Sequence, residues 1–128
     1  MNLLLSTRSG QGCTVVEVRG DLDMATSPRL RAGLQPLVDA GAGQVVVDLA
    51  GVAFMDSSAL GALAVTFKAL RAGGGRLCLA GPQEPVRGLL RVTSVDQVID
   101  VYDTVAAAEA SMPAGGGGVA AAAQPSAG

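Results

Sequence analysis

The chain of 128 residues contains no histidine and no tryptophan, and aromatic residues make up only 2% of it. Without histidine, a His-based catalytic triad, histidine phosphotransfer and a His-ligated zinc site are all excluded. Hydrophobic residues nevertheless account for 49% of the chain. One sizeable core is therefore expected, built from Val, Leu and Ala rather than from aromatic side chains.

Basic residues are few and form no run. Nine Lys and Arg stand against eleven Asp and Glu, which gives a formal net charge of −2. Nucleic-acid binding requires a basic patch or stripe, so no nucleic-acid partner is expected. The sequence also offers neither paired buried carboxylates nor a nucleophile with a neighbouring base. We therefore expect no enzymatic activity, no catalytic residue, no cofactor and no metal site.

Cysteine and long apolar runs are scarce as well. Cys13 and Cys78 both fall within expected strands and lack the spacing of metal ligands, which indicates reduced, structural thiols. Residues 1–5 have neither the positive start nor the apolar length of a signal peptide. No apolar run approaches the roughly 20 residues that span a bilayer. The sequence predicts a soluble, cytoplasmic protein with no membrane partner.

The order of apolar patterns predicts a mixed α/β fold. Strands are expected at 3–8 and 13–19, joined as an antiparallel hairpin by the turn-rich residues 9–12. The later elements are expected in this order: helix 26–41, strand 44–49, helix 58–72, strand 76–80, helix 86–92, strand 97–101 and helix 103–112. A hydroxyl cap near Thr26 and Ser27 is expected to begin the first helix, and the unbroken β-branched run at 44–49 indicates a strand that is buried on both faces. Alternating helices and strands favour a sheet of four to five strands, parallel after the hairpin and covered by about four helices.

Two segments depart from this pattern. Pro36 lies inside the first expected helix and is predicted to kink it or to end it early. Residues 113–128 consist largely of Gly, Ala and Pro and cannot bury enough surface to offset the entropy of ordering, so they are predicted to form a disordered tail. The predicted organisation is one domain over residues 1–112 followed by that tail.

The residues with the most chemistry stand where a buried strand gives way to a helix, at Asp56, Ser57 and Ser58. A helix start has four free N–H groups and the positive end of the helix dipole, and both favour an anion. Two interpretations remain open from the residues alone. Ser57 caps the helix, as Ser often does, or it is a site where a phosphate is added and removed.

Three segments together resemble a known family: Gly20–Asp23, Val47–Leu49 and Phe54–Gly61, the last reading Phe-Met-Asp-Ser-Ser-Ala-Leu-Gly. They are similar to STAS domains, in particular to the bacterial anti-sigma factor antagonists. Further segments fit the same pattern, namely Gly75–Leu77, Pro85–Arg87 and Val98–Tyr102. The resemblance covers about residues 3–112, and the STAS fold is therefore expected. Ala59 departs from it, since many members carry Gly there.

The resemblance implies partner switching. The unphosphorylated antagonist would bind an ATP-dependent anti-sigma factor serine kinase and so release a sigma factor. The kinase would phosphorylate the first serine after the aspartate, which is Ser57 here, and the complex would separate until a PP2C-type phosphatase removed the phosphate. Asp23 matches the acidic residue that the family carries near the phosphoserine.

The neighbouring residues take lesser roles in this interpretation. Asp56 is expected to act partly as a cap and partly in recognition, and Ser58 as the first helical residue and a secondary acceptor. Asp21 is expected to be a turn residue with a weaker part in partner binding. An alternative function is a STAS accessory subunit without a switch, serving a transporter or a lipid-trafficking complex. The intact Asp-Ser-Ser segment favours the switch.

Overall fold

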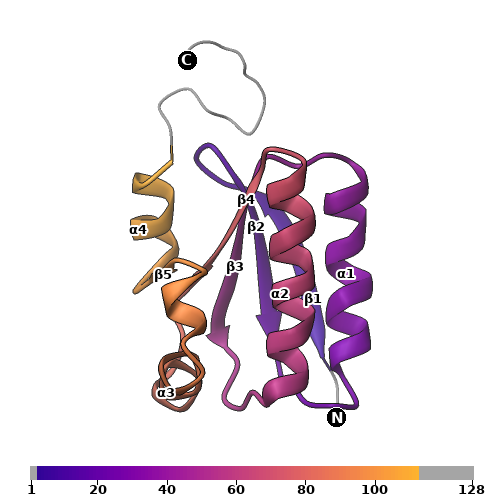
Figure 1. Cartoon of the computed structure of the whole chain (residues 1–128). Coiled ribbons are helices and arrows are strands. Elements are labelled where there is room, and N and C mark those ends of the chain that lie inside the picture. Colours follow the sequence, from indigo (N-terminus) through magenta and orange to yellow (C-terminus); the bar gives the residue numbers. More distant parts are fainter. Residues whose placement is uncertain (1–2, 113–128) are drawn as a thin grey trace.

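The computed structural model describes residues 3–112, and the predicted disordered tail at 113–128 lies outside the described residues. Five strands form one sheet in the order β1-β2-β3-β4-β5 (Figure 1). Their bounds are β1 Leu4–Ser9, β2 Thr14–Arg19, β3 Gln44–Gly51, β4 Arg76–Ala80 and β5 Val101–Tyr102. β1 pairs with β2 in antiparallel fashion, and every later pair is parallel. The predicted mixed sheet with an N-terminal hairpin is confirmed.

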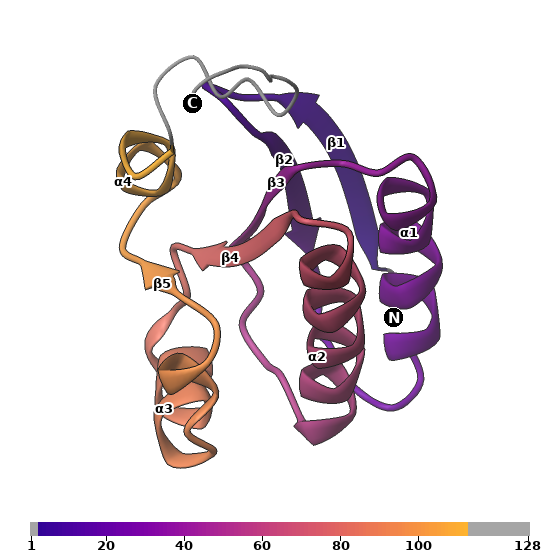
Figure 2. The ribbon, with the colours of Figure 1, turned by 45° about the horizontal axis from the view of Figure 1, so that its top comes forward.

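Four α-helices and one short 3-10 helix connect and cover the strands. Their bounds are α1 Ser27–Asp39, α2 Ser57–Ala72, α3 Glu84–Val92, the 3-10 helix Val95–Gln97 and α4 Val105–Ala110. α1 and α2 lie side by side over the sheet (Figure 2). Side chains from α1, α2 and α3 join the larger core, whereas α4 contributes to a smaller core on the opposite face.

The valine run of β3 explains why both faces of the sheet are covered. Successive side chains of a strand point to opposite faces. Val45 and Val47 are therefore buried in the larger core, and Val46 is buried in the smaller one with Cys78. The prediction of a strand buried on both faces is confirmed. Because β3 is fixed from both sides, the segment that follows it leaves the sheet at a defined position and leads into α2.

Three local predictions are wrong. Residues 97–101 do not form a strand: a 3-10 turn covers Val95–Gln97, and only Val101 and Tyr102 pair with β4. The β-branched residues of this segment favour a strand, but the backbone N–H groups of Val98 and Ile99 both donate to the oxygen of Val95, at 2.9 and 2.8 Å, and so close a turn instead of pairing with β4. The first helix also does not end early at Pro36, since α1 continues to Asp39. Pro36 has no N–H to donate to the carbonyl of Ala32, four residues earlier. Both residues are exposed, so water can donate a hydrogen bond to that carbonyl instead.

The third wrong prediction is the hydroxyl cap of the first helix. Thr26 is the N-cap residue of α1, but its side chain makes no capping hydrogen bond. Its hydroxyl instead donates to the backbone oxygen of Asp21 at 2.8 Å and accepts from the backbone N–H of Asp23 at 3.0 Å. Thr26 therefore stabilises the acidic loop that precedes the helix.

The two cysteines are free and buried. Burial raises the pKa of the Cys78 thiol to about 11, and burial likewise raises that of Cys13. Thiols with a raised pKa and no access to solvent are poor nucleophiles and poor metal ligands. Within residues 3–112, no helix is both long and apolar enough to cross a membrane.

Candidate functional site at the start of α2

The start of α2 is built around the carboxylate of Asp56. Asp56 is the N-cap residue in extended conformation, and its Oδ1 accepts the backbone N–H of Ser58 at 2.9 Å. The hydroxyl of Ser58 donates to the same oxygen. Ser57 is the first helical residue, is exposed, and has no side-chain hydrogen bond among the described residues. The cap is therefore Asp56, which leaves the Ser57 hydroxyl at the surface beside a helix N-terminus.

A backbone bridge holds a second loop against this helix start. Leu22 pairs with Met55 in parallel fashion outside the main sheet. The N–H of Leu22 donates to the oxygen of Phe54 at 2.9 Å, and the N–H of Asp56 donates to the oxygen of Leu22 at 2.9 Å. Segments 34 residues apart in the chain (56 minus 22) are thereby fixed side by side. The bridge brings the loop that carries Asp21 and Asp23 to the beginning of α2.

Within that loop, Asp23 has a local structural role. Its Oδ1 accepts the backbone N–H groups of Ala25 at 2.9 Å and Thr26 at 3.0 Å, so it closes the turn into α1. Asp23 is half-buried, and its Oδ2 has no hydrogen-bond partner among the described residues. Asp21 is half-buried too, and its backbone oxygen accepts the Thr26 hydroxyl. Both carboxylates add negative charge beside the start of α2.

A chain of hydroxyl groups links the two helix starts directly. The oxygens of Ser27 and Ser58 lie 2.9 Å apart, and the Ser27 hydroxyl lies 2.7 Å from the backbone oxygen of Asp23. The Ser58 hydroxyl also contacts Asp56, so the chain has three oxygen–oxygen contacts. Only two hydroxyl protons, those of Ser27 and Ser58, are available to them. Ser58 is thus already engaged between Asp56 and Ser27. Sequence reasoning did not predict this role of Ser27, because no motif includes it and it lies 31 positions before Ser58 in the chain.

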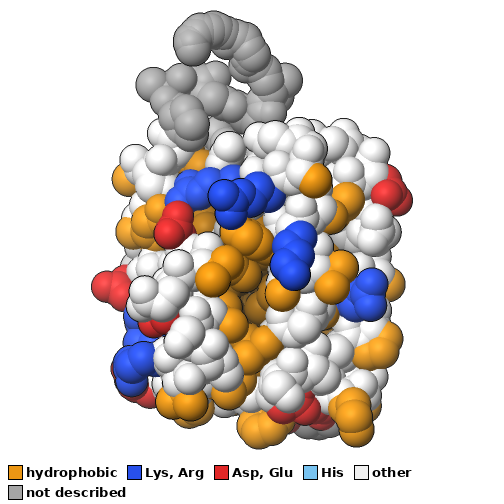
Figure 3. All heavy atoms as spheres, in the orientation of Figure 1, with side chains coloured by type: hydrophobic (Ala, Val, Ile, Leu, Met, Phe, Trp, Pro, Cys, Tyr) orange, Lys and Arg blue, Asp and Glu red, His pale blue; other side chains and the backbone are white. Residues whose placement is uncertain are grey.

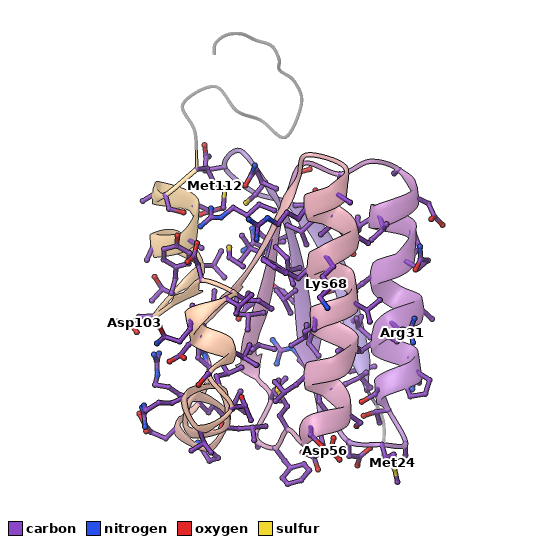
Figure 4. The ribbon with its side chains drawn as sticks, viewed as in Figure 1. Met24, Arg31, Asp56, Lys68, Asp103 and Met112 are labelled. Carbon is purple, nitrogen blue, oxygen red and sulfur yellow. The ribbon has the colours of Figure 1, made fainter. Side chains whose placement is uncertain are left out.

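Two apolar side chains beside this site are exposed, which the sequence patterns did not predict. Met24 is 77% exposed and Phe54 is 50% exposed. They stand on the two bridged segments, and Figure 4 shows Met24 and Asp56 together at the same end of the molecule. Large exposed apolar side chains beside a polar group are a common composition for a protein-binding surface.

The site therefore presents hydroxyls, carboxylates and exposed apolar side chains, which suit the recognition of a partner. Across residues 3–112, no three His, Cys, Asp or Glu side chains are grouped so that they could hold a metal ion. The pKa of Asp56 lies below its ordinary value, chiefly because the Ser58 hydroxyl donates to its carboxylate. Asp56 is therefore ionised near neutral pH and remains an acceptor for the helix start.

We expect this cap to give α2 a pH-dependent contribution to stability. The pKa of Asp56 is lower in the folded state than its ordinary value of 3.8, so its contribution is complete above that value. It is lost as the pH falls through the lowered pKa. The difference in unfolding free energy between the wild type and Asp56→Ala should therefore shrink across the acid range, as measured by urea titration at a series of pH values.

Asp56→Asn is the matched control for that measurement. Asn caps helices about as well as Asp but does not titrate. The difference between Asp56→Asn and Asp56→Ala should be the same at every pH tested. A wild-type advantage that persisted unchanged to the lowest pH would contradict the prediction.

Residues 5–108 match the STAS domain. The chain belongs to the STAS domain family. The anti-sigma-B factor antagonist of Staphylococcus epidermidis is 35% identical over 103 residues, which cover 80% of this chain and 95% of that protein. The protein of the same name from Bacillus subtilis is 32% identical over 101 residues, covering 79% and 92%.

Solved structures agree with this assignment. The crystal structure of an anti-sigma factor antagonist from Mycobacterium paratuberculosis has a TM-score of 0.79 to this STAS domain at 27% identity. The similarity covers 87% of this chain and 94% of the other. The predicted family and fold are confirmed. The roles of Ser57, Asp23, Asp56, Ser58 and Asp21 stay predictions, now with a geometry that brings all five residues to one end of the sheet.

Proposed function

We propose that this STAS domain is an anti-sigma factor antagonist switched by phosphorylation of Ser57. In this proposal the unphosphorylated protein binds an ATP-dependent anti-sigma factor serine kinase, and a sigma factor is released. The names of the relatives support the antagonist role. The single observation that favours Ser57 as the acceptor is its exposed hydroxyl, without a hydrogen-bond partner among residues 3–112, at the first position of α2.

Ser58 is the less suitable acceptor. Its hydroxyl donates to Asp56 and contacts Ser27, and the residue is half-buried. Phosphorylation there would require these contacts to break. We assign Ser58 to holding the two helix starts together.

The added phosphate is compatible with the fold but unfavourable for the partner. Phosphorylation adds about −1.5 to −2 charges and strong acceptor oxygens. The N-terminus of α2 stabilises an anion, so the domain stays folded. Asp21, Asp23 and Asp56 already make this end of the molecule negative. A partner surface that fits the neutral serine then faces a concentrated negative charge, and its affinity for the domain falls.

The remaining parts of the proposed cycle are what the likeness to the anti-sigma factor antagonists implies. A PP2C-type phosphatase would remove the phosphate and restore binding. Because the kinase uses ATP, we place the protein in the cytoplasm, as a regulatory binding protein without catalysis of its own. The accessory-subunit function remains the alternative, and it predicts no phosphorylation.

Intact-mass measurement separates the two functions. The anti-sigma factor kinases encoded in the same genome are purified and incubated one at a time with ATP and the domain. We expect one kinase to add a single phosphate to the wild type and to Ser58→Ala, and none to Ser57→Ala. Failure of every kinase to modify the wild type would overturn the switch, and a phosphate retained by Ser57→Ala would overturn the assignment of the residue.

A further inference from the structure

A groove of about 630 Å³ runs between α1 and α2, starting at the hydroxyls of Ser27 and Ser58 next to the proposed phosphorylation site. Its wall is largely apolar, formed by Met24, Pro28, Gly61, Ala62 and Val65. Met24 and Val65 are 77% and 48% exposed. At Gly61 a Cβ atom would meet nothing within 4 Å, so the missing side chain keeps this wall of the groove open.

The polar groups of the groove are distributed unevenly. The hydroxyls of Ser27 and Ser58 already contact each other. Arg31 is the one charged residue of the lining, and it makes no ion pair within the part of the chain that the structure describes. Lys68 follows Val65 one turn along α2, is exposed, and is likewise in no ion pair there. The apolar groove is thus flanked by one cation on each helix, Arg31 on α1 and Lys68 on α2.

The figures show this arrangement on one face of the molecule. Figure 4 places Arg31 on α1 and Lys68 on α2. The space-filling view shows the corresponding basic groups with hydrophobic atoms beside them, and acidic atoms at the foot of α2 (Figure 3). The sign of the charge therefore changes along this face, from carboxylates around Ser57 to cations farther along the groove.

We propose that the groove between α1 and α2 receives an apolar segment of the kinase whose flanking carboxylates pair with Arg31 and Lys68. This inference rests on the proposed function and extends the contact beyond Ser57. Its basis is charge complementarity: two unpaired cations beside an apolar groove fit a segment that is apolar in the middle and acidic at its sides. The groove is continuous with the phosphorylation site because Ser58 belongs to both.

Filling the groove tests the apolar part. Gly61→Leu places a side chain in the open space without a clash, and Leu is a better helix former than Gly, so the variant should be at least as stable as the wild type in urea titration. Affinity for the kinase that modifies Ser57 should fall at least about tenfold, measured by isothermal titration calorimetry. The matched control is Gly88→Leu on α3, where a Cβ also meets nothing within 4 Å. It should bind within about twofold of the wild type.

Charge reversal tests the acidic flanks. The double variant Arg31→Glu with Lys68→Glu should bind more slowly, and its association rate should rise with added salt, whereas that of the wild type should fall. Arg29→Glu reverses an exposed charge of α1 that does not line the groove, and should leave the association rate within about twofold.

The outcomes separate this inference from the function on which it rests. If no kinase binds the wild type, both are overturned. If the kinase binds and phosphorylates Gly61→Leu as it does the wild type, the groove is not part of the contact, although the switch stands. A second copy of the chain as the occupant would appear as a wild-type dimer in light scattering that Gly61→Leu dissociates while kinase binding is unchanged, and this too overturns the inference.

Discussion

Ser57→Asp should bind the kinase about a hundredfold more weakly than the wild type, or not measurably. The substitution places a fixed negative charge at the first position of α2, beside the carboxylates of Asp23 and Asp56. Like charges brought together at an interface cost several kcal/mol, and about 2.7 kcal/mol corresponds to a hundredfold loss of affinity. Calorimetric titration of the kinase with each variant measures the effect.

Two controls separate the effect of charge at Ser57 from the loss of its hydroxyl and from added charge elsewhere. Ser57→Ala removes the hydroxyl without adding charge and should bind as tightly as the wild type. Ser9→Asp adds the same charge at the end of β1, which lies at the opposite end of the sheet from the start of α2 (Figure 1), and should also bind normally. Urea titration should give Ser57→Asp a stability close to that of the wild type, because the helix start favours an anion. Tight binding by Ser57→Asp would rule out the electrostatic mechanism.

The second large effect is expected for Leu22→Ala. Leu22 is completely buried, and its backbone forms both hydrogen bonds of the bridge to residues 54–56. Truncating a buried leucine costs about 2–5 kcal/mol through lost contacts and the cavity that remains. Since domains of this size are stable by roughly 5–15 kcal/mol, this is a large part of the total. The free energy of unfolding in urea should fall by that amount.

Leu77→Ala distinguishes the site effect from the loss of stability. Leu77 is 1% exposed in β4, on the same core, but takes no part in the bridge. Both variants should lose comparable stability. At a temperature where both are folded, Leu22→Ala should be phosphorylated more slowly on Ser57, whereas Leu77→Ala should match the wild type. Equal rates for the two variants would show that the bridge does not position Ser57.

Periodicity in the sequence was sufficient for the elements that are buried in regular fashion. The valine run of β3 and the leucine stripe of α2 repeat as the two kinds of structure require, and both elements are where they were predicted. The sequence pattern failed between residues 95 and 101, where the same residue types suit a strand but the N–H groups of Val98 and Ile99 bond within the chain to Val95. A two-residue strand at the end of a sheet leaves too short a pattern to recognise.

The site was predictable only in part, for a related reason. Asp56 and Ser57 are local features, since a cap and a first helical residue are adjacent in the chain. The contact of Ser27 with Ser58 depends on how α1 packs against α2, and no spacing in the sequence reports it. The hydrogen bonds by which Asp23 closes the turn at Ala25 and Thr26 depend on the backbone conformation of that loop, which no sequence pattern reports.

The bridge between Leu22 and Met55 also bears on the timing of the proposed switch. Both loops around Ser57 are fixed by backbone hydrogen bonds, so neither has to rearrange before or after the phosphate arrives. In the proposed switch, release of the partner would then follow the chemical step without a conformational delay. The amount of partner bound would then depend directly on the ratio of kinase to phosphatase activity, and binding would recover as fast as the phosphatase removes the phosphate.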